Sequence, residues 1–147
     1  MRRTWFSFVP TAVMIFLVSA MWLHGPIYQP EQYHDFADAR VFFGVSNAMD
    51  VLSNAGFLLV GVWALLALLP GLRERDVDGV RVAYFLFAVS VFATALASSY
   101  YHFAPDNARL FWDRLPIALA CASLLAAVRL DGVQWTWRAG CELALWL

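Results

Sequence analysis

The chain has 147 residues, a formal net charge of −1, 62% hydrophobic residues and 14% charged residues. Soluble domains average about 45–50% apolar and about 25% charged residues, so this composition excludes an ordinary water-soluble domain. The basic residues are all arginine and form no basic cluster, which argues against a nucleic-acid partner. A helix that crosses a bilayer takes about 20 apolar residues, so the length allows four spans and part of a fifth.

The first two apolar runs predict two membrane-spanning helices. The run at 5–23 is long for a signal peptide, and no small-residue cleavage site follows it, so we expect a retained helix. Residues 24–45 are polar, aromatic and proline-bearing, which is typical of a loop at the membrane interface. The second run, about 46–69, ends at Pro70 and Gly71, which rarely continue a helix.

The second half of the chain predicts two further spans and the start of another. The third run covers about 80–102, and the fourth covers about 110–128 after a connector rich in turn-forming residues. We expect the polar and tryptophan-bearing segment 131–140 to close the fourth span at the headgroup layer. Residues 141–147 then begin a truncated fifth span. The sequence therefore predicts an all-α transmembrane bundle, a single membrane domain over 1–147 that forms the N-terminal part of a longer protein.

The arginines predict the orientation of these spans, because basic residues accumulate in the cytoplasmic loops of membrane proteins. Three arginines fall on one side of the predicted spans: Arg40, Arg109 and Arg114. Seven share the other side with the N-terminus: Arg2, Arg3, Arg73, Arg75, Arg81, Arg129 and Arg138. We therefore expect a cytoplasmic N-terminus, with the connectors 24–45 and 103–110 on the far side.

Three polar residues near the far ends of the third and fourth spans form the strongest candidate site. Ser98 and His102 are four residues apart and therefore share one face of the third span. The short connector folds the fourth span back, which predicts that Asp113 lies at the membrane depth of His102. Ionisable residues in a span usually face a partner, a cavity or a site. The alternatives are a serine bonded to its own helix, an interfacial histidine, and a carboxylate at a helix start.

Two kinds of chemistry fit a serine, a histidine and an aspartate. A catalytic triad requires the imidazole between the hydroxyl and the carboxylate, but no nucleophile-elbow sequence surrounds Ser98. A zinc site would use His102 as ligand and Asp113 to handle the proton of a bound water. Catalytic zinc usually has three protein ligands, and the other histidines, His24 and His34, lie in or near the first connector.

A second polar group stands where the second span begins. Asn47, Asp50 and Asn54 have the spacing of one helix face, and Asp35 and Asp38 precede them. Several carboxylate and amide oxygens are the ligands that calcium takes. Helix capping and interhelical hydrogen bonds explain the same residues without a metal, and spacing alone favours that second interpretation.

Three segments resemble bacterial members of the alkaline ceramidase family, within the wider superfamily of seven-helix membrane hydrolases. These segments are YHDFADAR (33–40), GVSNAMDVLSNAGFLLVG (44–61) and SSYYHFAPDNARLFWDRLP (98–116). The most specific element is the S-x-x-x-H pair, Ser98 and His102, followed by Trp112 and Asp113. The resemblance covers roughly residues 33–130, and the helix at 5–23 stands ahead of the family's first.

The resemblance implies a membrane amidase that hydrolyses ceramide-like sphingolipids to a sphingoid base and a fatty acid. It implies a zinc ion on three histidines, of which His102 is one and the other two form an H-x-x-x-H pair on the last helix. It assigns proton transfer to Asp113 and oxyanion stabilisation to Ser98. It also implies calcium near the first family helix, for which the nearest candidates are Asp35, Asp38, Asn47 and Asp50.

The chain departs from the family pattern, because the H-x-x-x-H pair is absent from its residues. We therefore expect an incomplete zinc site, a lipid substrate that enters from the bilayer, and a location in the bacterial inner membrane. Two rival functions stay open. One is a receptor-like or structural membrane protein that keeps the polar cluster for stability, and the other is a transporter in which His102 and Asp113 relay protons.

Overall fold

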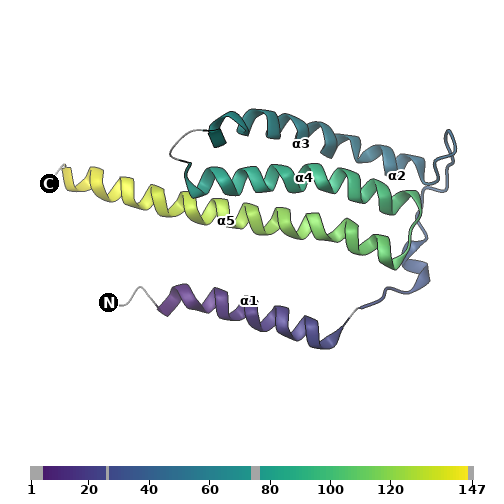
Figure 1. Cartoon of the computed structure of the whole chain (residues 1–147), viewed down its shortest axis with the longest axis horizontal. Coiled ribbons are helices and arrows are strands. Elements are labelled where there is room, and N and C mark those ends of the chain that lie inside the picture. The colour runs from purple at the N-terminus through teal and green to yellow at the C-terminus, as the bar shows by residue number, and fades with distance from the viewer. Residues whose placement is uncertain (1–4, 26, 74–76, 146–147) are drawn as a thin grey trace. The chain divides into compact units, whose positions relative to one another are not determined.

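The computed structural model consists of helices, with a long connector over residues 25–47 and shorter ones after it (Figure 1). Residues 1–30 and 31–147 form two separate compact units. The structure describes the backbone of residues 5–25, 27–73 and 77–145, and the side chains of 12–25, 27–72 and 77–132. Arg2, Arg3 and Arg75 lie outside the described residues, as do the side chains of Arg138 and Cys141.

The first unit contains helix α1, Trp5–His24, which confirms the helix predicted over 5–23. Its 20 residues match the length that a bilayer requires. Over the part whose side chains are described, Ala12–His24, the helix is apolar.

The second unit is a helical bundle in which α4 lies between α3 and α5 and contacts both (Figure 1). The predicted all-α fold is therefore confirmed. The helices of this unit are α2 (Ala48–Ser53), α3 (Ala55–Leu68), α4 (Gly79–Phe103) and α5 (Asn107–Leu145), with 3-10 turns η1 (Glu31–His34) and η2 (Pro70–Arg73).

Aspartate side chains cap the N-termini of the two long helices, α4 and α5. The Asp78 carboxylate accepts a hydrogen bond from the Arg81 backbone N–H at 2.7 Å at the start of α4. The Asp106 carboxylate accepts one from the Arg109 backbone N–H at 2.7 Å at the start of α5. Each aspartate satisfies an N–H group that has no partner within the first helical turn.

Asn54 separates α2 from α3, a break that the sequence analysis did not predict. Its buried side-chain amide donates a hydrogen bond to the Asp50 backbone carbonyl at 3.1 Å. The backbone carbonyl of Asn54 accepts a hydrogen bond from the Leu58 N–H at 3.1 Å. The backbone remains αR at Asn54, so α2 and α3 follow one helical path from Ala48 to Leu68.

Small residues bring α4 close to its neighbours. A Cβ atom on Gly61 of α3 would lie 2.7 Å from the Phe92 Cα and 2.8 Å from the Phe92 backbone nitrogen of α4. Ala83, Ala88 and Ala95 of α4 are buried. Helices that pack inside membranes use small residues in this way, because lipid tails leave close van der Waals contact as a main source of attraction.

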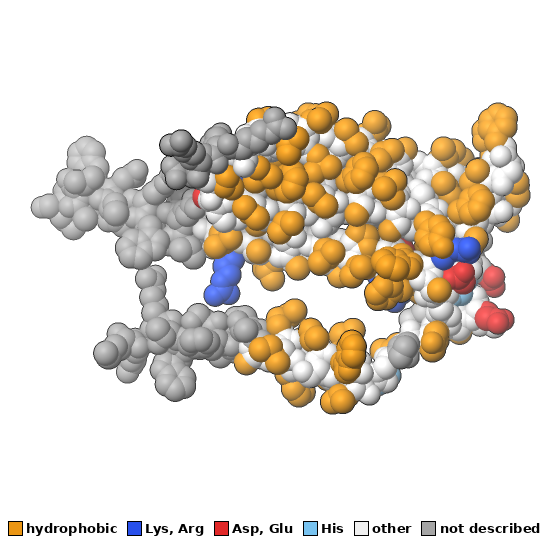
Figure 2. Space-filling model, viewed as in Figure 1, with side chains coloured by type: hydrophobic (Ala, Val, Ile, Leu, Met, Phe, Trp, Pro, Cys, Tyr) orange, Lys and Arg blue, Asp and Glu red, His pale blue; other side chains and the backbone are white. Residues whose placement is uncertain are grey.

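Among the residues whose side chains the structure describes, three helical stretches are long and apolar enough to cross a membrane: Ala48–Leu68, Gly79–Phe103 and Asn107–Gly132. Large apolar side chains stand exposed along them, including Leu59 and Trp63 at 72% and Leu125 at 71%. Figure 2 shows such side chains over much of the described helical surface, with charged side chains gathered where the loops lie. The fold is therefore consistent with a membrane protein.

The end of α5 differs from the prediction. We expected 131–140 to close the fourth span and 141–147 to begin another, but the helical backbone continues without a break to Leu145. Residues 131–140 contain no proline, and an isolated glycine is tolerated within a helix, so polarity alone does not end it.

Candidate functional site

Ser98, His102 and Asp113 lie near the ends of α4 and α5 that the connector 104–106 joins (Figure 1). With a rise of about 1.5 Å per residue, Ser98 is roughly 7.5 Å before the end of α4 and Asp113 roughly 9 Å past the start of α5. The same rise puts His102 roughly 1.5 Å before the end of α4, so all three residues lie within about two turns of the joined helix ends. The structure thus brings Ser98, His102 and Asp113 to the same end of the α4–α5 pair, and a common membrane depth of His102 and Asp113 stays a prediction.

The polar face of α4 combines structural hydroxyl groups with the candidate serine. The Ser90 hydroxyl donates to the Leu86 carbonyl at 2.8 Å, and the Thr94 hydroxyl donates to the Ser90 carbonyl at 2.8 Å. Such bonds satisfy a hydroxyl within its own helix. Ser98 continues this face one turn later and is 8% exposed.

His102 is half-buried in the last turn of α4. Its ring lies 4.6 Å from the ring of Phe36, measured between centroids. Its backbone carbonyl accepts a hydrogen bond from the Asn47 side-chain amide at 2.8 Å, which satisfies a carbonyl at the helix end. The Nδ1 atom of the ring is buried and has no hydrogen-bond partner.

Asp113 shares this property, because its Oδ1 atom is also buried without a partner. Most buried polar atoms in proteins are hydrogen-bonded, so an unpartnered one requires a specific explanation such as a bound water or ion. His102 and Asp113 thus present two unpartnered ligand-type atoms on neighbouring helices.

Tyr33 and His34 of η1 attach the first connector to both helices. His34 Nδ1 and the Tyr101 hydroxyl share a hydrogen bond of 2.9 Å, and Tyr101 is only 2% exposed. Arg114 donates to the Tyr33 hydroxyl at 2.8 Å and stacks over its ring. Tyr101 and Arg114 are the chain neighbours of His102 and Asp113, so adjacent residues of η1 anchor both candidate positions.

The sequence analysis did not predict these partners. His34 was assigned to the connector, and neither Tyr33 nor Tyr101 was a candidate. The buried Nε2 atom of His34 and the buried Nε atom of Arg109 also have no hydrogen-bond partner, so four such atoms lie in this part of the described structure. The one available signal was the clustering of tyrosine and histidine in both 33–34 and 100–102.

Arg109 stabilises the connector between α4 and α5. Its guanidinium donates to the Ala104 carbonyl, lies 3.1 Å from the Asp106 carboxylate and stacks over the Tyr100 ring at 5.0 Å. These contacts hold together the two helix ends that carry His102 and Asp113.

Asp38, a calcium candidate, caps α2 from outside that helix. Its Oδ2 accepts the Met49 N–H at 2.7 Å, and its Oδ1 accepts a hydrogen bond from the Arg40 guanidinium at 2.6 Å. The bond from Arg40 is the main reason that the pKa of Asp38 lies below its ordinary value; burial opposes this effect, and the Met49 N–H adds to it.

The other calcium candidates, Asp35, Asn47 and Asp50, have different surroundings and share no contact among those described. Asp35 is exposed, Asp50 is half-buried, and the Asn47 amide is bonded to the His102 carbonyl. Within the described part of the chain, no group of three or more His, Cys, Asp or Glu residues has an arrangement that could hold a metal ion. The Arg40 cation beside Asp38 disfavours a second cation there, so Asp38 does not fit a calcium site as it stands, and calcium stays a prediction.

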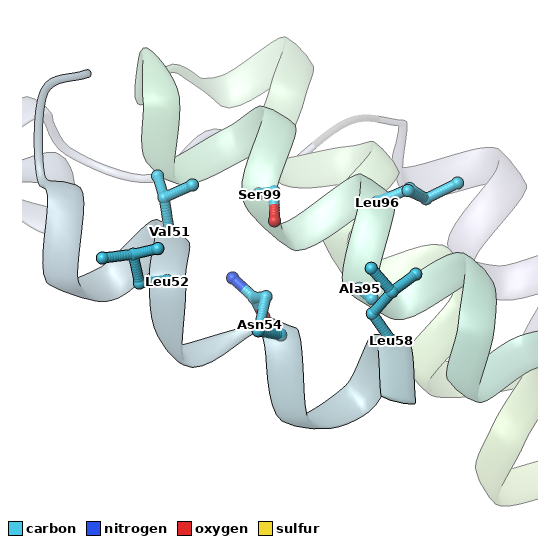
Figure 3. Close-up of a pocket in the computed structure, with 8 residues that line it drawn as sticks. Val51, Leu52, Asn54, Leu58, Ala95, Leu96 and Ser99 are labelled. Carbon is cyan, nitrogen blue, oxygen red and sulfur yellow. The ribbon is translucent and has the colours of Figure 1, made fainter. Parts of the chain in front are cut away.

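A cavity of about 170 Å³ opens between α2–α3 and α4 (Figure 3). Figure 3 shows the Asn54 amide and the Ser99 hydroxyl at this cavity among apolar side chains. It is lined by Val51, Leu52, Asn54, Ala55, Leu58, Ala95, Leu96 and Ser99. Ser98, His102 and Asp113 are not among the lining residues, so the cavity is distinct from the candidate site.

Comparisons with models of protein families, with curated proteins and with solved structures gave no match to the chain. Any reaction that this protein carries out must therefore be inferred from the residues of the candidate site. The unpartnered atoms of His102 and Asp113 fit a polar or ionic group bound at this end of the bundle, and His102 is a suitable zinc ligand.

Proposed function

We propose that the chain contributes to a zinc-dependent membrane amidase that hydrolyses the N-acyl bond of ceramide-like sphingolipids. The observation that carries the proposal is the pair of buried, unpartnered atoms, His102 Nδ1 and Asp113 Oδ1, on neighbouring helices. The resemblance of residues 33–130 to alkaline ceramidases supplies the reaction class.

His102 would hold the zinc ion as one of the three histidine ligands that the resemblance implies. Of the other histidines in the sequence, His24 lies in α1, and the Nδ1 atom of His34 is hydrogen-bonded to Tyr101. Zinc at such a site acts as a Lewis acid towards a carbonyl group and activates water. The half-buried imidazole packs against the Phe36 ring at an interplanar angle of 46°, and that packing limits the orientations in which it can bind a metal.

Asp113 and Ser98 have separate roles in the proposed reaction. Asp113 accepts the proton of the attacking water at its unpartnered carboxylate oxygen and then delivers it to the leaving amine nitrogen. The Ser98 hydroxyl on α4 donates a hydrogen bond to the oxygen that gains negative charge. A well-placed donor of this kind contributes about 3–4 kcal/mol to the stability of a transition state.

The exposed apolar faces of the spans support a location in a membrane. We propose a bacterial inner membrane protein with a cytoplasmic N-terminus, so that the candidate site lies near the opposite face. A lipid substrate then reaches the site from within the bilayer, because its acyl chains remain in contact with apolar helix surfaces throughout.

The test measures fatty-acid release from labelled ceramide and zinc content on one preparation of the full-length protein, purified in lipid nanodiscs. We expect stoichiometric zinc and release of fatty acid, and we expect His102→Ala to abolish both. His24→Ala is the matched control, because His24 lies in α1 outside the bundle unit, and it should retain both properties. Full activity in a metal-free preparation would exclude the proposal.

A further inference from the structure

A strained turn stands directly before α2. Phe42 and Val45 exchange two backbone hydrogen bonds, of 3.1 and 3.0 Å, and enclose Phe43 and Gly44 as a two-residue hairpin. Both central residues have positive φ, 49° at Phe43 and 79° at Gly44, as type I′ turns require. Asparagine is the favoured first residue of such turns, whereas a bulky side chain at positive φ is an outlier.

The side chain at the strained position has almost no contact with the rest of the chain. Phe43 is 92% exposed, and its ring contacts the ring of its neighbour Phe42, at 4.4 Å between centroids. Phe42 and Val41 are themselves 59% and 67% exposed. The packing of the described residues therefore does not explain why phenylalanine occupies this position. Strain of this kind in a backbone points to a functional role.

The hairpin is attached to the end of a membrane span. The Ala48 N–H donates to the Arg40 carbonyl at 3.1 Å, which ties the base of the hairpin to the first residue of the span Ala48–Leu68. Figure 1 shows the hairpin projecting from the end of the bundle beside α2. Its apolar tip therefore lies close to the level at which the span leaves the hydrocarbon.

The charge at the base of the hairpin also fits a lipid surface. The Arg40 side chain is 74% exposed although it is paired with Asp38, so its free donors remain open to solvent. Interfacial anchors combine aromatic and apolar side chains with a basic residue such as arginine. The apolar side chains enter the boundary between headgroups and acyl chains.

We propose that the hairpin tip, Val41, Phe42 and Phe43, inserts into the interfacial layer of the bilayer that the spans cross and anchors the first connector there. The turn projects the Phe43 ring into the acyl boundary, while Arg40 stays at the level of the lipid phosphates. The anchor is independent of the proposed amidase chemistry. It fixes the connector that also carries Asp38 and η1 at the membrane surface.

The test uses a nitroxide label on Val41→Cys in phosphatidylcholine vesicles, with Cys121 and Cys141 replaced by alanine. Collisions of the label with oxygen, which concentrates in lipid, are compared with collisions with a water-soluble nickel complex. A label on Gln32→Cys, an exposed position of η1, is the reference. We expect the ratio of oxygen to nickel collisions to be several-fold higher at Val41 than at Gln32.

The variant Phe43→Asn isolates the role of the ring, because asparagine suits a positive φ and keeps the turn. We expect Phe43→Asn to lower the ratio at Val41 to that at Gln32, with helical content unchanged in circular dichroism. Equal ratios at the two positions in the parent protein would overturn the proposal. The proposal would also be overturned if the Val41 label collided with neither oxygen nor nickel and showed spin–spin broadening. That result would show that the hairpin contacts a second copy of the chain.

Discussion

His34 and Tyr101 share a hydrogen bond of 2.9 Å across 67 residues of sequence. It joins the short turn η1 to the last turns of α4, one residue before His102. Tyr33 makes the equivalent link to α5 through Arg114, beside Asp113. The first connector is therefore part of the site's scaffold and not merely a link between spans.

The contact of His34 with Tyr101 predicts a measurable loss of stability. His34→Phe leaves the Tyr101 hydroxyl buried without a partner, which costs about 1–3 kcal/mol. Thermal unfolding in nanodiscs should show a lower midpoint for this variant. The double variant with Tyr101→Phe should lose less than the sum of the two single losses, because neither residue then keeps an unpaired group. Strictly additive losses would show that the two side chains do not interact.

Gly61 provides a test of the packing between α3 and α4. Gly61→Ala places a methyl group within 2.9 Å of three Phe92 atoms, so we expect a destabilisation of about 1–3 kcal/mol through overpacking. Gly56→Ala in the same helix is the matched control, since no atom lies within 4 Å of the added Cβ. There we expect no loss, and a gain of up to about 1 kcal/mol from helix propensity. Similar effects at both positions in thermal unfolding would contradict the close approach at Gly61.

The spans could be predicted from sequence because their signals are local. Apolar runs, the stop at Pro70 and the turn residues before Asn107 predict the limits of α1, the Ala48–Leu68 stretch and α4, and the start of α5, within a few residues of those observed. The break at Asn54 lacks such a signal, because its backbone stays helical. The continuation of α5 past 131 shows that polarity marks where an apolar face ends, but not where a helix ends.

The sequence predicts only part of the candidate site, because local signals do not encode contacts between distant residues. Ser98 and His102 follow from helical spacing, and a short connector is enough to bring Asp113 to the same end. The contacts of Tyr33 and His34 span 81 and 67 residues and depend on how the connector folds over the helix ends. No periodicity within a connector encodes such contacts.

Asp38 predicts how stability depends on pH. The folded state lowers the pKa of its carboxyl below the ordinary value of about 3.9, mainly through the bond from Arg40. The carboxylate therefore stabilises the fold above that value, and this contribution is lost as the pH falls through the lowered pKa. Unfolding midpoints measured from neutral pH into the acid range should fall less steeply for Asp38→Asn than for the parent protein. Parallel profiles would show that Asp38 has no role in acid unfolding.

Asp113→Asn separates the amidase proposal from a purely structural role of the polar cluster. The Oδ1 atom of Asp113 forms no hydrogen bond, and an unpartnered carboxylate oxygen that is buried makes the folded state less stable. Replacing the carboxylate by a neutral amide of the same size should therefore leave the unfolding midpoint unchanged or higher. Hydrolysis of ceramide should nevertheless fall about 10²–10⁴-fold, the usual contribution of a general acid–base group. A structural cluster predicts the reverse, a lower unfolding midpoint with no turnover to lose, so both quantities measured on one preparation decide between the two roles.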